Sequence, residues 1–212
     1  MQCSKLKARR SKLLTAGQSM LEGVIATGII VTAISSALTL VSSSINAEKE
    51  SEALLTAGNL AREGIEAVRS IRDSNWLAGA AFDTGLSSGT DYSGIPMLST
   101  ATGLWSINFT PNVVTDAGTY VYRCSACAGA LASGVMLQAS APPVGTVRTP
   151  YQRLVTIDPL CDNDAGGYTI VSSGSNCGSA AKIGVRVMSK VRWTVGTRTR
   201  TLDMEERMLD WR

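Results

Sequence analysis

The residues of this chain that could do chemistry are cysteines and carboxylates, because its 212 residues include no histidine. Without histidine, Ser-His-Asp and Cys-His catalysis are excluded, together with most catalytic zinc sites. Serines are numerous, but lysine is the only base that could activate one of them. The sequence therefore predicts no catalytic residue, and we expect a protein that is not an enzyme and carries no cofactor.

Four cysteines in the second half of the chain are the most reactive set. Their positions leave open either two disulfides, with three possible pairings, or a metal site that begins at a Cys-x2-Cys turn. The last two cysteines have the wrong spacing for a second zinc knuckle. No βαβ pattern surrounds the Cys-x2-Cys turn, which favours a structural disulfide over a redox pair. The disulfide candidates are Cys124, Cys127, Cys161 and Cys177.

The segment CDNDAGGY, residues 161–168, is a weak candidate for binding Ca²⁺. Asp162 and Asp164 could supply oxygen ligands. The first glycine, however, comes one position too early for the calcium-loop pattern. A tight turn inside a disulfide loop explains the same residues equally well, and we expect no metal here.

Basic side chains near the C-terminus are a weak candidate for binding nucleic acid. On the outer face of a predicted hairpin they could neutralise phosphates, which makes DNA a possible but not a favoured partner. The alternation puts Trp193 on the opposite face, so that no aromatic side chain joins them. Lysines and arginines also discourage an exposed strand from pairing with other chains. The residues concerned are Arg186, Lys190, Arg192, Arg198 and Arg200.

The N-terminal segment has the charge pattern of a membrane anchor, which would decide on which side of the membrane the cysteines and the C-terminal hairpin lie. Residues 1–17 carry five basic residues and no acid, so the remainder holds 20 − 5 = 15 basic and 17 acidic residues. From Leu21 to Val41 there is one charge, and a helix of this length spans roughly 31 Å, close to the hydrocarbon thickness. The positive-inside rule places the N-terminus in the cytoplasm and the body outside. An exported body favours disulfides. Because the apolar run continues into a polar helix, we expect a lasting anchor and not a cleaved secretory signal.

Glu22 is the single charge of that apolar run. A carboxylate in the membrane interior costs about 2.5–3.5 kcal/mol on insertion scales, and such groups tend to be paired and functional. At the level of the lipid headgroups the same side chain would cost little. The residue by itself leaves both interpretations open.

The basic leader ending in Gly17, followed by Gln18-Ser19-Met20-Leu21-Glu22 and an apolar helix, resembles the class III signal of type IV prepilins and pseudopilins. The resemblance implies that prepilin peptidase cuts between Gly17 and Gln18 on the cytoplasmic face. It also implies that Glu22 pairs with the N-terminal amine of a neighbouring subunit inside a filament. Gln18 stands where the family usually has phenylalanine. A glutamine at the new N-terminus can be methylated like the family's usual residue, or it can cyclise and lose its amine.

The rest of the chain favours an α+β fold. An apolar stripe at three- and four-residue steps predicts a helix packed on a sheet; it consists of Leu54, Ala57, Ala61, Ile65, Val68 and Ile71. This region looks most like minor pilins of the PilV type. Strands with period two are predicted around residues 105–109, 151–157 and 183–195, and the last turns at Gly196-Thr197 into a return strand.

These patterns predict the type IV pilin-like layout, one long N-terminal helix packed on an antiparallel sheet. The expected segments are a leader (1–17), a transmembrane assembly helix (18–46), an amphipathic extension (47–76) and a β-rich head outside the membrane (77–212).

The resemblance implies a minor pilin-like subunit that a peptidase cleaves and that assembles into a pilus. Its partners would be prepilin peptidase, other pilin subunits, the inner-membrane assembly platform and membrane lipid. We expect a single-pass protein of the cytoplasmic membrane that reaches the pilus or cell surface after assembly. Two alternatives remain: a pseudopilin of type II secretion, and a membrane-anchored binding protein that never polymerises.

Overall fold

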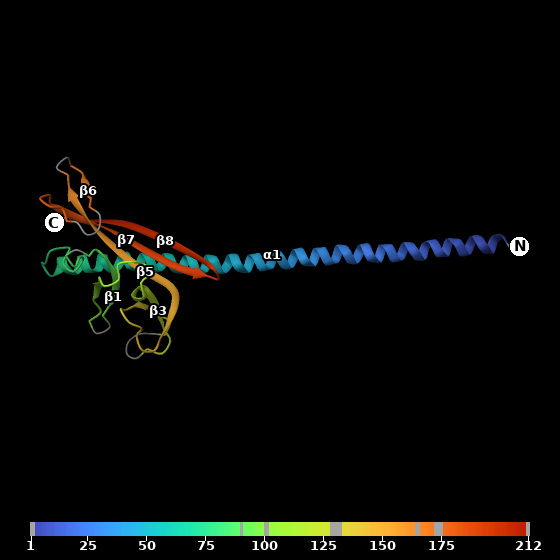
Figure 1. The fold of residues 1–212 in the computed structure, drawn as a ribbon, viewed down its shortest axis with the longest axis horizontal. Helices are drawn as coiled ribbons and strands as arrows, with labels where there is room; N and C mark the ends of the chain where they lie inside the picture. The colour runs from blue at the N-terminus through green and yellow to red at the C-terminus, as the bar shows by residue number, and fades with distance from the viewer. Residues whose placement is uncertain are drawn as a thin grey trace. The chain divides into compact units, whose positions relative to one another are not determined.

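The computed structural model describes residues 3–89, 91–99, 102–127, 133–163, 166–171 and 176–210, with side chains from residue 19 onward. These residues form one long helix, a short 3₁₀ turn and an antiparallel sheet (Figure 1). The elements are α1 (Cys3–Leu77), β1 (Ser93–Leu98), β2 (Trp105–Asn108), η1 (Ala117–Thr119), β3 (Tyr120–Cys124), β4 (Met136–Gln138), β5 (Thr146–Asp162), β6 (Tyr168–Ile170), β7 (Lys182–Val195) and β8 (Arg198–Leu209).

The chain divides into two compact units, Met1–Ser51 and Glu52–Arg212. The first unit consists of the N-terminal part of α1, and this part is long and apolar enough to cross a membrane. Its threonine and serine hydroxyls bond to main-chain oxygens three or four residues earlier; Ser35, for example, donates to Val31 at 2.8 Å. Because these polar groups find partners inside the helix, they can face lipid at little cost. The segment fits a single-pass membrane protein.

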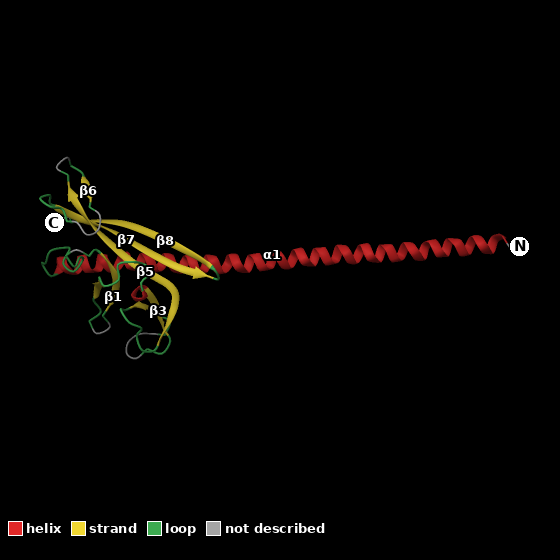
Figure 2. Ribbon diagram, in the orientation of Figure 1, coloured by secondary structure: helices red, strands yellow, loops and turns green. Residues whose placement is uncertain are grey.

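The sheet of the second unit is built around β5 (Figure 2). One edge of β5 pairs with β7 from Tyr151 to Cys161, and β7 pairs in turn with β8. The other edge pairs with β3 near its start, with β1 in its middle and with β6 at its end. β2 pairs with β1 on the side away from β5, and β4 pairs in the same way with β3. One long strand therefore carries a continuous hairpin on one side and three short strands on the other.

The hydrophobic core lies between residues 53–76 of α1 and the facing side chains of β5 and β7. The predicted stripe is confirmed for most of its members, which are at most 8% exposed. The prediction that Leu54 belongs to the buried stripe is wrong, because its side chain is 50% exposed and Ala53 is buried in its place. An α-helix has 3.6 residues per turn, so residues three or four apart lie on the same face. Ala53 and Ala57 therefore share a face with Leu60 and Ala61. The predicted α+β layout, a long helix packed on an antiparallel sheet, is present.

Gly64 is a point of close approach between α1 and the sheet. A Cβ atom built there would lie 2.5 Å from Oγ of Ser189 and 3.2 Å from a methyl group of Val155. Ser189 itself is fully buried and its hydroxyl has no hydrogen-bond partner among the described residues. The missing side chain at Gly64 thus lets the helix backbone approach β5 and β7 more closely than any other residue would allow.

Candidate functional site

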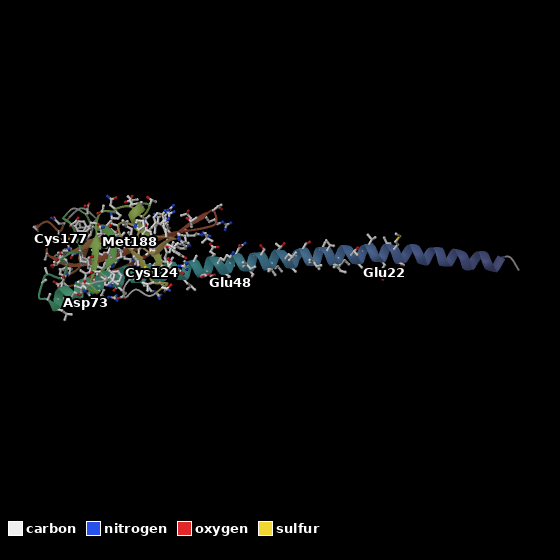
Figure 3. All side chains as sticks on the ribbon, turned by 90° about the horizontal axis from the view of Figure 1, so that it is seen from below. Glu22, Glu48, Asp73, Cys124, Cys177 and Met188 are labelled. Atoms are coloured by element: carbon white, nitrogen blue, oxygen red, sulfur yellow. A yellow bond between two sulfur atoms is a disulfide. The ribbon has the colours of Figure 1, made fainter. Side chains whose placement is uncertain are left out.

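Glu22 lies in the first unit, on a helical segment whose side chains project outward on all sides (Figure 3). The backbone is helical at Gly17 and Gln18, the predicted cleavage position, but their side chains lie outside the described residues. Glu22 itself is exposed. The carboxylate therefore lies at the start of a helical surface whose side chains are exposed.

The surface around Glu22 is almost entirely apolar. Large apolar side chains between residues 20 and 45 are 47–78% exposed. A soluble monomer rarely exposes an apolar patch of this extent, so lipid or another protein must cover it. The side chains are Met20, Leu21, Val24, Ile25, Ile29, Ile30, Val31, Ile34, Leu38, Leu40, Val41 and Ile45.

The four cysteines of the second unit form two disulfides. Cys124 is joined to Cys127 and Cys161 to Cys177, with Cα–Cα distances of 5.6 and 5.4 Å. This arrangement fits the predicted disulfides and selects one of the three pairings. Within the residues that the structure describes, no three His, Cys, Asp or Glu side chains come together as a metal site.

Asp162, one of the two weak Ca²⁺ candidates, is the last residue of β5. It lies opposite Tyr168, and its main-chain N–H donates to Ala181. The next residue, Asn163, accepts a bond of 2.9 Å from the N–H of Gly167 through its side-chain oxygen. Asp164 lies outside the described residues. The side-chain oxygen of Asn163 is thus bonded to the main chain four residues further on.

The basic side chains of the C-terminal hairpin do not share one face, which corrects the prediction. Val195 pairs with Arg198 and Trp193 with Arg200, and residues paired across an antiparallel ladder point to the same face. The two arginines therefore lie on the face of the core side chains, near the hairpin tip. The opposite face holds the other three: Arg186, Lys190 and Arg192.

Those three residues have partners on the sheet. Arg186 forms an ion pair with Asp158, which is 2% exposed, and Lys190 lies 3.5 Å from Asp203. Arg192 donates to the side-chain oxygen of Gln152 at 2.7 Å. Two of the three cations are thus paired with carboxylates, and the third is hydrogen-bonded to a neutral amide. The carboxylates reduce the positive charge that this face could offer to phosphate groups.

Arg153 is a buried charge in the predicted strand 151–157, and the sequence predicts no role for it. Its side chain is 1% exposed. The guanidinium donates to Oε1 of Gln138 at 2.8 Å and to the main-chain oxygen of Leu60 at 2.9 Å, and it lies 3.3 Å from the carboxylate of Glu63. Burial lowers the pKa of Arg153, and the charge of Glu63 opposes that shift. An arginine at an inward position of a strand was the available signal.

No family model matches this chain, and no curated protein or solved structure was found to resemble it.

Proposed function

We propose that this chain is a minor type IV pilin-like subunit, cleaved after Gly17 and assembled into a filament through its N-terminal helix. In this proposal the second unit is the head that the filament carries outside the membrane. The chain is a substrate of prepilin peptidase and has no catalytic activity of its own. The observation that carries the proposal is the position of Glu22, a lone carboxylate at the start of an apolar helical surface.

That position supports assembly because the carboxylate and the apolar side chains need partners of different kinds. Lipid suits the apolar surface but leaves a buried carboxylate uncompensated, at a cost of several kcal/mol for an ion of this kind. A neighbouring helix of the same type can supply both an apolar face and the positive charge of its N-terminal amine. The small residues of the segment, Gly23 and Gly28 among them, permit helices to pack closely.

The junction of leader and helix supports the same proposal. Cleavage after Gly17 creates the amine at Gln18, four residues before Glu22 in the sequence. In a bundle of parallel helices shifted along their axes, the amine of one chain can lie beside the carboxylate of the next. Ion pairing across chains then fixes the axial register of the bundle.

The test is to express the full chain with a prepilin peptidase and its assembly machinery, and to compare Glu22→Gln with wild type. We expect both chains to begin at Gln18 and to insert in the membrane. The variant should fall by at least about tenfold in the sheared filament fraction, because it lacks the charge that compensates the amine. Glu48→Gln, on the same helix beyond the apolar run, is the matched control and should assemble normally.

Two results would overturn the proposal. One is a chain that still begins at Met1 in the presence of active peptidase. The other is a Glu22→Gln variant that assembles as well as Glu48→Gln. The first result would favour a membrane-anchored binding protein that does not polymerise, and the second would show that the charge of Glu22 has no part in assembly.

A further inference from the structure

The sheet forks along one edge of β5. β3 pairs with β5 only as far as Tyr120 opposite Gln152, whereas β1 pairs with it at Ser93 and Gly94, opposite Thr156 and Val155. Beyond Gly94, β1 turns to pair with β2 alone. The strand pairs β1–β2 and β3–β4 thus leave β5 at neighbouring points, and β1 and β4 come into contact with each other.

A side chain closes the base of this fork. The amide of Gln138, at the end of β4, donates to the main-chain oxygens of Arg153 at 2.8 Å and Thr119 at 2.7 Å. Its own oxygen accepts from the guanidinium of Arg153. Gln138 is 4% exposed and uses both ends of its amide. The fork is therefore held open at a fixed width by a buried polar network, because each of these groups would lose a partner if the strand pairs closed together.

A pocket of about 330 Å³ lies above this base. Its size falls within the usual range of small-molecule sites. β1 and β2 contribute Leu98 and Trp105 to one wall, and the other wall comes from the start of β4 and the residue before it. The described residues that line it are Glu63, Leu98, Trp105, Val135, Met136, Leu137 and Gln138.

Glu63 is the one charged residue of that lining, and it comes from α1. Its Oε1 lies 3.3 Å from the guanidinium of Arg153, but the two partners differ in exposure: the arginine is 1% exposed and Glu63 is 35% exposed. The carboxylate of Glu63 therefore lines the pocket, whereas the guanidinium of Arg153 is buried. A carboxylate beside apolar walls and an indole ring suits a ligand with a cationic head and an apolar body.

We propose that this pocket binds a small aromatic primary amine, with its ammonium group at Glu63 and its ring between Trp105 and Leu137. Ion pairing and the indole face select the cation, and the two walls select an apolar body of limited size. This site is separate from the assembly surface around Glu22, so the proposal does not depend on filament formation.

The test uses the full chain in bilayer nanodiscs, labelled with 5-fluorotryptophan, and follows the ¹⁹F signal of Trp105, which is assigned with Trp105→Phe. The probes are 2-phenylethylamine, its neutral analogue 2-phenylethanol and the aliphatic amine n-butylamine. We expect 2-phenylethylamine to shift the signal saturably and to bind at least about tenfold more tightly than either other probe.

Two variants separate the charge from the apolar walls. Glu63→Gln keeps the shape of the side chain and should weaken the amine by about tenfold or more, with little effect on the alcohol. Glu66→Gln, one helical turn further along α1 and 60% exposed, is the matched control and should bind like wild type. Val135→Trp, which places a large side chain in the pocket wall, should abolish binding of all three probes.

The outcomes decide between the parts of the proposal. Equal affinity for the amine and the alcohol, or an unchanged amine affinity in Glu63→Gln, would overturn the role of the carboxylate. Equal affinity for n-butylamine and the aromatic amine would overturn the role of the apolar walls. A Trp105 signal that no probe shifts would overturn the site as a whole. If Glu63→Gln fails to fold, the comparison of amine with alcohol in wild type still tests the charge.

Discussion

The guanidinium of Arg153, in β5, donates to the main-chain oxygen of Leu60, in α1, across 2.9 Å. Its side chain is 1% exposed and also bonds to Gln138, so one buried residue joins the helix, the central strand and the end of β4. Buried charges are tolerated only where hydrogen bonds and an opposite charge compensate them. Here two oxygens and the carboxylate of Glu63 do so.

Replacing this residue should destabilise the second unit. Arg153→Met keeps an apolar stem but leaves the side-chain oxygen of Gln138 buried without its partner, a loss of about 2–4 kcal/mol in the free energy of unfolding. Urea unfolding followed by tryptophan fluorescence measures this effect, because all four tryptophans lie beyond residue 51. Lys190→Met, which removes an ion pair between partly exposed side chains by breaking the contact with Asp203, is the control and should cost less than half as much. Similar losses in both variants would contradict the role given to the buried network.

Gly64 and Gly58, six residues apart on α1, should respond in opposite directions to alanine. At Gly64 a Cβ would lie 2.5 Å from Oγ of Ser189, and we expect a net loss of about 1–2 kcal/mol even though alanine favours a helix. At Gly58 the nearest atom lies 4.0 Å away, so Gly58→Ala should stabilise by about 0.5–1 kcal/mol. Urea midpoints of the two variants make the comparison.

Ser189→Ala tests whether the crowding at Gly64 has the stated cause. The hydroxyl of Ser189 has no partner among the described residues, so its removal alone should cost little. In the double variant with Gly64→Ala it should restore part of the lost stability, since the closest contact disappears. A double variant as unstable as Gly64→Ala alone would show that Val155, and not Ser189, limits the approach.

The elements with strong periodicity were predictable from the sequence, and those defined by long-range pairing were not. The helical stripe and the alternation of 183–195 follow from local geometry and are confirmed. β1 to β4 are short, three to six residues each, and their positions depend on which part of β5 they meet. No local pattern specifies that Gln138 will fill the gap between them. The pocket therefore had no signal in the sequence.

The misplaced arginines have a simpler cause. The prediction puts all the basic residues of the hairpin on its outer face, but the two-residue turn at Gly196-Thr197 sets the register of both strands. Because Val195 and Arg198 flank the turn as a pair, they share a face. With this turn, the pairing rule predicts Arg198 and Arg200 on the face of Val195 and Trp193.

Tyr151 should make the second unit less stable at alkaline pH. Burial raises the pKa of its phenol, which also donates to the main-chain oxygen of Ala53 at 3.4 Å. Because the folded state holds this proton more tightly, the stabilisation is complete below the unfolded pKa of about 10 and is lost as the pH rises through the higher folded pKa. The free energy of unfolding should thus fall more steeply above pH 10 in wild type than in Tyr151→Phe. Parallel pH profiles would contradict this assignment.

The two disulfides should differ in their contribution to stability. Cys161–Cys177 closes a separation of 16 residues and Cys124–Cys127 a separation of 3. In the chain-entropy description, a longer loop constrains the unfolded chain more strongly, which gives about 3 kcal/mol for the first and about 2 kcal/mol for the second. The paired alanine variants, unfolded in urea under the same conditions, measure both. Peptide mapping of the unreduced wild type must first recover these pairs, and a Cys124–Cys177 peptide would refute the pairing on which the difference rests.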